Sequence, residues 1–250
     1  MILFEYPFNE RVRALLRLEY LFDRMMFFAR PGDARQHQVA LTALFDLLDA
    51  TERTDMKGSV LQDLERQKNV LLSLKDHPGV DTKTLNAMLL EIERAANNLN
   101  ATGKTGQLLR ENEWLASIRG RLAVPGGGTQ VDMPSFHAWQ YRPEIERCAD
   151  LHRWMSSLMP LQAGIAIVLK LLRESGQTEA AVGPQGAYQQ MLSGKVYQLL
   201  RVWVDESQNT FPEISANKYM VWIRFASQDG ELKPQPVVRD VPFKMALCAL

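Results

Sequence analysis

The spacing of hydrophobic residues changes once along this chain, near Gly176. Before that point apolar side chains follow the stripe of a helix lying on a core, and the clearest run is Leu85, Met88, Leu89, Ile92, Ala96 and Leu99. After it, apolar and polar side chains alternate, as in Tyr219 to Phe225, which is typical of a strand in a half-buried sheet. Helices first and strands last favour an α+β fold over alternating βαβ units. We therefore predict an N-terminal all-helical domain, residues 9–175, followed by a C-terminal antiparallel β-strand domain, residues 176–250.

The helical stripes predict helices at 10–28, 36–49, 58–74, 82–99, 108–122, 151–158 and 161–172. Asp81 directly precedes one of them and is a good N-cap, because its carboxylate can accept an orphan backbone N–H. The run from Pro125 to Gly128 ends the helix before it, since proline and glycine do not continue helical hydrogen bonding. The segment that follows, near residues 129–139, is predicted to be extended.

Strands are predicted at 195–205, 219–225 and 237–245. Turn residues separate them at 209–212, 229–230 and 234–236. The apolar opening of the chain can add an edge strand, residues 1–8, to the β-strand domain, because Pro7 is tolerated at such an edge.

The charge balance bears on the kind of partner. Lys plus Arg number 29 and Asp plus Glu number 29, so the summed field around the molecule is weak. We therefore expect no nucleic acid partner, which would require a continuous basic stripe.

The most apolar stretch, 161–172, is interrupted by polar residues and is about half of the roughly 20 residues that span a bilayer. No membrane insertion is expected, and because Met1 to Asn9 lacks the features of a signal peptide we expect a cytoplasmic protein.

Chemical motifs are sparse. The two cysteines, Cys148 and Cys248, have no partners at zinc spacing, and the four histidines are scattered, so no metal and no cofactor is predicted. Gly103 to Thr105 resembles the end of a phosphate-binding loop, but the first glycine of that motif would fall at Asn98. We expect a non-enzymatic protein, and the alternative is an enzyme with a small-molecule site near His137 and Trp139.

Basic and aromatic residues occur together instead. On helix 10–28, Arg13, Arg17, Tyr20 and Arg24 are spaced so that they share one face. A solvated face paired with acids such as Glu10 is the alternative reading. Further cations are Arg110, Arg119, Arg121, Lys218, Arg224, Arg239 and Lys244. In a chain of zero net charge, such local patches suit a carboxylate-bearing peptide bound by arginine forks.

Seven ordered motifs from one end of the chain to the other carry a family resemblance. They are LFEYPFNE at 3–10, LRLEY at 16–20, PGVD at 78–81, GQLLRE at 106–111, RLAVPGG at 121–127, DMPSFHAW at 132–139 and FPEIS at 211–215. In order and separation they resemble the ZapD family of FtsZ-associated cell division proteins. The resemblance implies a homodimer that binds the C-terminal tail of FtsZ, bundles its filaments and stabilises the division ring at midcell.

The resemblance also implies site residues. Arg17, His137 and Trp139 match family positions of a partner-binding pocket. Lys218, Arg224 and Arg239 match basic positions in the β-strand domain. This chain has Glu113 and Met220 where relatives carry basic residues. The neighbouring arginines predicted to substitute for them are Arg110, Arg119 and Arg121.

Overall fold

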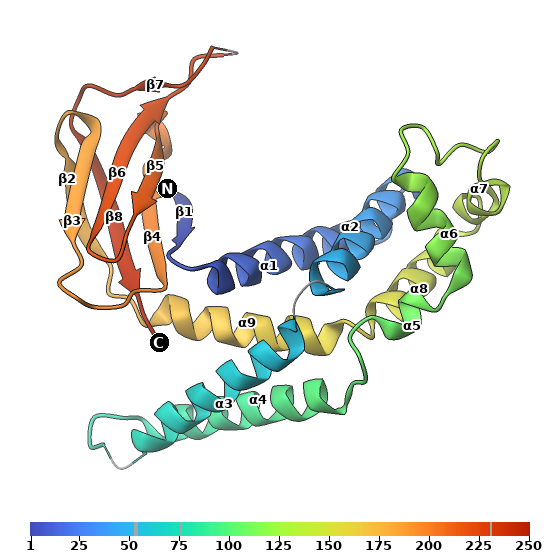
Figure 1. Ribbon diagram of the computed structural model, residues 1–250, viewed down its shortest axis with the longest axis horizontal. Coiled ribbons are helices and arrows are strands. Elements are labelled where there is room, and N and C mark those ends of the chain that lie inside the picture. Colours follow the sequence, from blue (N-terminus) through green and yellow to red (C-terminus); the bar gives the residue numbers. More distant parts are fainter. Residues whose placement is uncertain (53–54, 76, 231) are drawn as a thin grey trace. The chain divides into compact units, whose positions relative to one another are not determined.

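A computed structural model describes residues 1–52, 55–75, 77–230 and 232–250. One strand opens the chain, helices lie between residues 10 and 174, and antiparallel strands follow from residue 179 (Figure 1). The helices are α1 (Glu10–Phe28), α2 (Ala34–Glu52), α3 (Met56–Ser73), α4 (Thr82–Ala101), α5 (Gln107–Arg110), α6 (Glu113–Leu122), α7 (Pro134–Gln140), α8 (Glu144–Met155) and α9 (Met159–Glu174). The predicted α+β fold class is confirmed.

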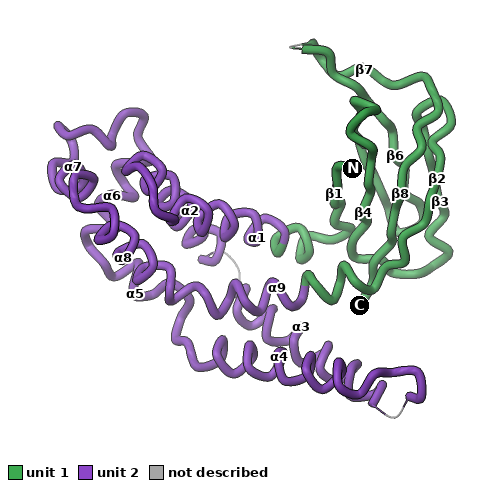
Figure 2. Tube along the Cα trace, turned by 180° about the vertical axis from the view of Figure 1, so that it is seen from behind, with its two compact units in different colours: residues 1–15, 169–250 green, residues 16–168 purple. Residues whose placement is uncertain are grey.

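The chain forms two compact units (Figure 2). Residues 1–15 and 169–250 make up the first, which we call the β unit. Residues 16–168 make up the second, the helical unit. The first residues of α1 and the last residues of α9 therefore belong to the β unit.

Capping side chains decide where several helices begin. The Asp81 carboxylate accepts from the backbone N–H groups of Lys83 and Thr84 at 3.3 and 3.1 Å, so the predicted N-cap of α4 is confirmed. Asn112 caps α6 by accepting from Leu115 N at 3.0 Å. That cap explains why the single helix predicted at 108–122 is wrong: the chain breaks at Asn112 into α5 and α6, and Leu108 is 75% exposed.

The extended segment expected near residues 129–139 is also different in the structure. Turns occupy 129–132, and α7 begins at Pro134. Proline suits this first helical position because its fixed φ is helical and its missing N–H would have no helical partner there. Phe136 and Trp139, three residues apart, are then buried on one side of α7.

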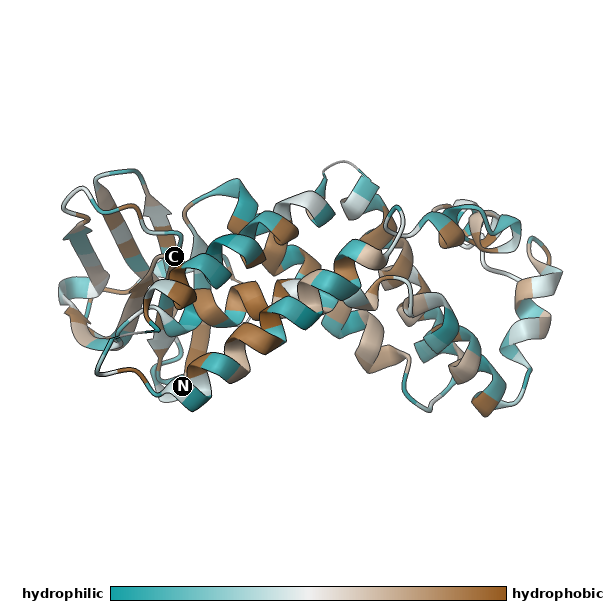
Figure 3. Ribbon diagram, turned by 90° about the horizontal axis from the view of Figure 1, so that it is seen from below, coloured by the Kyte–Doolittle hydropathy of each residue, from teal (hydrophilic) through white to brown (hydrophobic). Residues whose placement is uncertain are grey.

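Most helices have one hydrophobic and one hydrophilic side (Figure 3).

In the helical unit, Arg147 of α8 is buried, and its partners are mostly backbone carbonyls. Its guanidinium donates to the carbonyls of Gly32, Gln140 and Arg142, and its Nε donates to Nδ1 of the buried His37 at 3.1 Å. One arginine thereby joins the α1–α2 connection to the α7–α8 connection.

The β unit contains two antiparallel sheets. One has the order β1-β4-β8-β2, and the other has the order β3-β6-β5, with β7 paired to β6. The strands are β1 (Ile2–Pro7), β2 (Glu179–Gly183), β3 (Ala187–Met191), β4 (Leu199–Val204), β5 (Phe211–Ala216), β6 (Met220–Ser227), β7 (Gln235–Pro236) and β8 (Val241–Cys248). Alternate residues of both sheets form a shared core, in which the rings of Phe225 and Phe243 lie 5.1 Å apart.

Strand pairing corrects the sequence-based boundaries. The strands predicted at 195–205 and 237–245 begin later, at Leu199 and Val241. Strand β5 starts at Phe211, inside a segment predicted as a turn. Pro212 is tolerated there because β5 is an edge strand, whose outer side needs no backbone donor.

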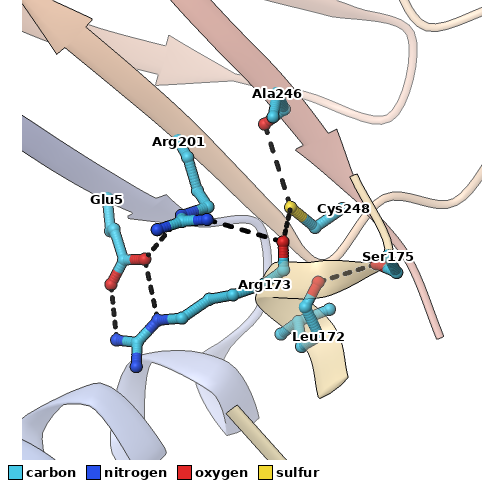
Figure 4. Close-up of polar contacts among 7 residues, drawn as sticks. All are labelled: Glu5, Leu172, Arg173, Ser175, Arg201, Ala246 and Cys248. Atoms are coloured by element: carbon cyan, nitrogen blue, oxygen red, sulfur yellow. Dashed lines mark hydrogen bonds and ion pairs between the residues drawn. The ribbon is translucent and has the colours of Figure 1, made fainter. Parts of the chain in front are cut away.

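A three-residue ion cluster joins elements of the β unit (Figure 4). Arg173 of α9 donates to both carboxylate oxygens of Glu5 on β1, at 2.9 and 2.7 Å. Arg201 of β4 donates to the same carboxylate at 3.1 Å and lies over the Trp203 ring. The cluster therefore attaches the end of α9 to the sheet that contains β1 and β4.

Candidate peptide-binding surfaces

Helix α1 has a buried face and an exposed basic-aromatic face. The buried side chains are Val12, Leu15, Leu18, Phe22 and Met25. Arg17, Tyr20, Arg24 and Phe27 follow at intervals of three or four residues and share the other side, which we call the α1 face. Tyr20 is 64% exposed and Phe27 is 58% exposed. Large aromatic side chains exposed on one helix face are typical of interaction surfaces.

A groove of about 480 Å³ runs along the C-terminal part of this face. Its lining consists of Tyr20, Asp23, Arg24, Met26, Phe27, Phe28 and Arg30. The guanidinium carbon of Arg30 lies 5.3 Å from the centre of the Phe27 ring, within cation–π range. Arginine forks beside aromatic rings can hold a carboxylate and an apolar side chain at the same time.

Arg17 differs from its helical neighbours in its partners. The Arg13 guanidinium donates to Glu10 at 3.0 Å, so the solvated, acid-paired face considered from the sequence describes Arg13. Arg17 is exposed, and within the described residues its side chain makes no hydrogen bond and no ion pair. Its donors are therefore available to a carboxylate from outside the chain.

Arg24 lies in the field of acids on α2. The pKa of the Asp46 carboxyl is raised, chiefly because the group is partly buried. The Arg24 guanidinium opposes this rise, and the Asp49 carboxylate adds to it. Arg24 thus serves partly to offset negative charge within the helical unit, and Arg17 is the freer of the two cations.

Arg110 and Arg119 lie together at the C-terminal end of α2. Arg110 donates to the Leu48 carbonyl at 3.0 Å and to the Thr105 carbonyl, and Arg119 forms an ion pair with Asp49. These contacts use their donors within the chain. Arg121 is exposed, and its side chain contacts no polar partner among the described residues.

Trp139 is a core residue. It is 3% exposed, its indole N–H donates to Asp150 at 3.0 Å, and its ring stacks on Phe136 at 5.8 Å. Trp114 and Trp154 complete this aromatic cluster. His137 points elsewhere and meets Tyr141 edge to face at 4.9 Å. The pair predicted from the sequence is therefore divided between the core and the surface.

The three cations predicted in the β-strand domain lie in different places. Lys218 is at the turn between β5 and β6 and lies over the Tyr219 ring at 4.8 Å. Arg224 is exposed on β6 and lines a groove with Trp222. Arg239 donates to the Gln208 carbonyl at 2.7 Å.

Lys218 lines a pocket that is rich in aromatic rings. We call it the Lys195–Lys218 pocket. Its volume is about 420 Å³, and it lies entirely within the β unit. The side chains that define it are Tyr6, Phe8, Lys195, Tyr197, Lys218 and Tyr219.

Several of these residues were not among those predicted from the sequence. Phe27 could have been found by continuing the spacing of the basic helix face by three residues beyond Arg24. Lys195 and Tyr197 had no such signal, because they meet Tyr6 and Lys218 only through the folding of distant segments.

Within the residues that the structure describes, no cluster of three His, Cys, Asp or Glu side chains could hold a metal ion. In the same part of the chain, no single helix is long and apolar enough to cross a membrane. Among the described helices, α8 and α9 reach the required length and composition only as a pair, and that pair is bent by 68°.

Comparison with known proteins shows the family. A family model described as the cell division protein ZapD matches residues 16–224. Cell division protein ZapD of Bordetella pertussis is 67% identical over 249 residues, covering 100% of this chain and 98% of the relative. The proteins of the same name from Ralstonia pickettii and Janthinobacterium sp. are 52% and 50% identical over 250 residues, covering 99% and 100% of both chains. This chain therefore belongs to the ZapD family of cell division proteins.

Proposed function

We propose that this protein is a non-enzymatic adaptor that binds the C-terminal tail of FtsZ and crosslinks FtsZ filaments as a homodimer. It acts in the cytoplasm, at the division ring at midcell. The proposal extends the family assignment, which supports a role in cell division.

The observation that carries the proposal is the α1 face. Among the described residues Arg17 donates to no partner, and Tyr20 and Phe27 expose aromatic surface on the same side of the helix. A short acidic and apolar peptide needs both kinds of contact. The charged fork orients the peptide, and the buried apolar side chains supply the larger share of the binding energy.

The alternative of an enzyme near His137 and Trp139 receives no support from the geometry. Trp139 fills the core of the helical unit and cannot line an open substrate site.

Cosedimentation tests the proposal as a whole. The full chain is mixed with polymers of intact FtsZ and, in parallel, with polymers of FtsZ lacking its C-terminal tail. We expect the protein to pellet with intact polymers and to increase their bundling, and to remain in the supernatant with tailless polymers. Equal pelleting with both polymers would contradict tail binding.

Titration of a tail peptide tests the α1 face. Arg17→Ala should weaken binding by about 2 to 5 kcal/mol if the guanidinium holds a desolvated carboxylate. A solvated arginine would contribute no more than about 1 kcal/mol. Arg35→Ala is the matched control, because Arg35 is 92% exposed and pairs only loosely with Asp33, at 3.5 Å.

Arg17→Lys separates charge from geometry. A lysine ammonium keeps the charge but cannot form the planar two-pronged contact of arginine. Full recovery of affinity in Arg17→Lys would show that charge alone is needed at this position. Unchanged affinity in a folded Arg17→Ala protein would remove the α1 face from the proposal.

A further inference from the structure

His37 of α2 is fully buried, and both of its ring nitrogens have partners in the helical unit. Arg147 donates its Nε–H to Nδ1 at 3.1 Å, so Nδ1 is an acceptor and carries no proton. Nε2 lies 3.0 Å from the Arg30 carbonyl oxygen, which can only accept, so Nε2 carries the proton. These partners assign His37 to the neutral tautomer with its proton on Nε2.

The contact with Arg147 opposes a second proton on this ring. A proton on Nδ1 would point at the guanidinium and would remove the hydrogen bond between the two side chains. Both groups would then be positively charged, in contact and shielded from water, because Arg147 is itself buried. The pair would have to separate before His37 could ionise.

No acid in contact with the pair offsets that charge. Within the described part of the chain, no Asp or Glu side chain forms an ion pair or a hydrogen bond with His37 or Arg147. The acids within four residues of either group are Asp33, Glu144, Glu146 and Asp150. The first three are exposed to solvent, which screens their charge, and the last accepts from Trp139, Arg142 and Arg153.

The other groups around His37 are uncharged or positive. The Cys148 thiol lies 3.7 Å from Nε2, and burial raises the pKa of this thiol, which therefore stays uncharged at neutral pH. The Trp139 ring is centred 6.5 Å away and carries no charge. The side chain of Arg30 is exposed and lies over the Phe27 ring. The charged side chain in contact with the imidazole is thus a cation, which favours the neutral ring.

The same two side chains join separate parts of the helical unit. Arg147 donates to the carbonyls of Gly32 and Gln140, at 3.0 and 3.2 Å, and His37 donates to that of Arg30. A guanidinium repelled by a charged ring would lose this arrangement. We propose that His37 and Arg147 form an acid-sensitive latch, which holds the α1–α2 connection on the α7–α8 connection only while His37 is neutral.

The latch predicts a loss of stability in acid. An unfolded histidine takes up a proton with an ordinary pKa of about 6.5, whereas His37 stays neutral in the folded chain. Unfolding below that pH therefore takes up a proton, and stability that is complete at higher pH is lost as the pH falls. A histidine that stays fully neutral in the fold raises the unfolding equilibrium constant roughly 25-fold between pH 7 and pH 5.

Urea unfolding of the full-length chain at pH 7 and pH 5, at one protein concentration, tests the latch. The variant is His37→Asn, because asparagine offers an amide oxygen to Arg147 but does not titrate. From pH 7 to pH 5, the unfolding equilibrium constant should rise at least about fivefold more in the parent than in His37→Asn. A smaller difference would overturn the proposal.

His152→Asn is the matched control on α8. His152 is exposed, and its Nδ1 lies 2.7 Å from the Cys148 carbonyl oxygen, so Nδ1 carries the proton. Nε2 can then accept a further proton without loss of that hydrogen bond. We expect His152→Asn to keep the pH dependence of the parent within about twofold. An equal loss of pH dependence in both variants would exclude a latch specific to His37.

NMR of the imidazole nitrogens in the ¹⁵N-labelled parent tests the latch even if His37→Asn does not fold. The signals of the other three histidines are assigned by replacing each with asparagine, which leaves those of His37. We expect His37 to show the neutral tautomer protonated on Nε2 at pH 7 and to keep it in the folded chain at pH 5. A proton on Nδ1 of folded His37 at either pH would overturn the proposal.

Discussion

At the scale of single residues, Glu5 shows how a partly buried charge supports this fold. Its side chain is 14% exposed and accepts from Arg173 and Arg201, whose side chains are 25% and 20% exposed. Glu5→Gln would leave two arginines partly buried beside a neutral amide. We expect the free energy of unfolding to fall by about 3 kcal/mol, as measured by denaturant unfolding.

Glu206→Gln is the control for that measurement. Glu206 also accepts in an ion pair, from the N-terminal ammonium at 3.0 Å, but its side chain is 71% exposed. Exposed pairs contribute at most about 1 kcal/mol. Equal losses of stability in the two variants would show that the cluster in Figure 4 acts as an ordinary surface ion pair.

At the scale of elements, helix caps decide where the helices of this chain begin, and one cap predicts a dependence on pH. Hydrogen bonds from the Thr84 side chain and from the backbone N–H groups of Thr84 and Lys83 lower the pKa of the Asp81 carboxyl. Because the pKa is lower in the folded than in the unfolded chain, ionised Asp81 favours folding. This contribution is complete above the ordinary pKa of the carboxyl and is lost as the pH falls through the lowered value.

The expected result is a difference that depends on pH. Asp81→Ala should unfold at a lower temperature than the parent at pH 7, and the gap between the two proteins should narrow in strong acid. Asp81→Asn serves as the comparison, since asparagine also caps helices but does not titrate. A gap between the parent and Asp81→Ala that stays constant down to strong acid would contradict this role.

At the scale of the whole molecule, crosslinking of filaments requires at least two attachments. We predict that the protein is a homodimer in solution at micromolar concentration, with amphipathic helices of the N-terminal half as the interface. Each tail contact is expected to be weak, with a dissociation constant of about 1 μM. Two sites in one dimer would then raise the effective concentration of the second contact and make bundling much tighter than peptide binding.

Mass measurement and bundling assays check that prediction together. A variant that is monomeric by light scattering should still bind the tail peptide and should fail to bundle FtsZ filaments. A strictly monomeric parent, or a monomeric variant that bundles as well as the parent, would exclude avidity between protomers as the mechanism.

Much of the fold could be predicted because it depends on local signals. The range of α1, the cap at Asp81 and the strand beginning near Tyr219 all follow from spacing and from single capping residues. The errors arose where one local signal opposed another. Asn112 breaks an otherwise continuous helical stripe, and Pro134 starts a helix in a segment that looks extended.

The sequence by itself determined the order of helices and strands, the family and the presence of basic residues suited to a peptide, because periodicity, motifs and charge can be read along the chain. Only the tertiary structure decided which of those residues are available. It buries Trp139 and directs Arg110 to backbone carbonyls, and it leaves Arg17 without a partner among the described residues. It also unites Lys195 with Lys218 beside Tyr6. Burial and partners depend on contacts between segments far apart in the chain, and no local pattern encodes them.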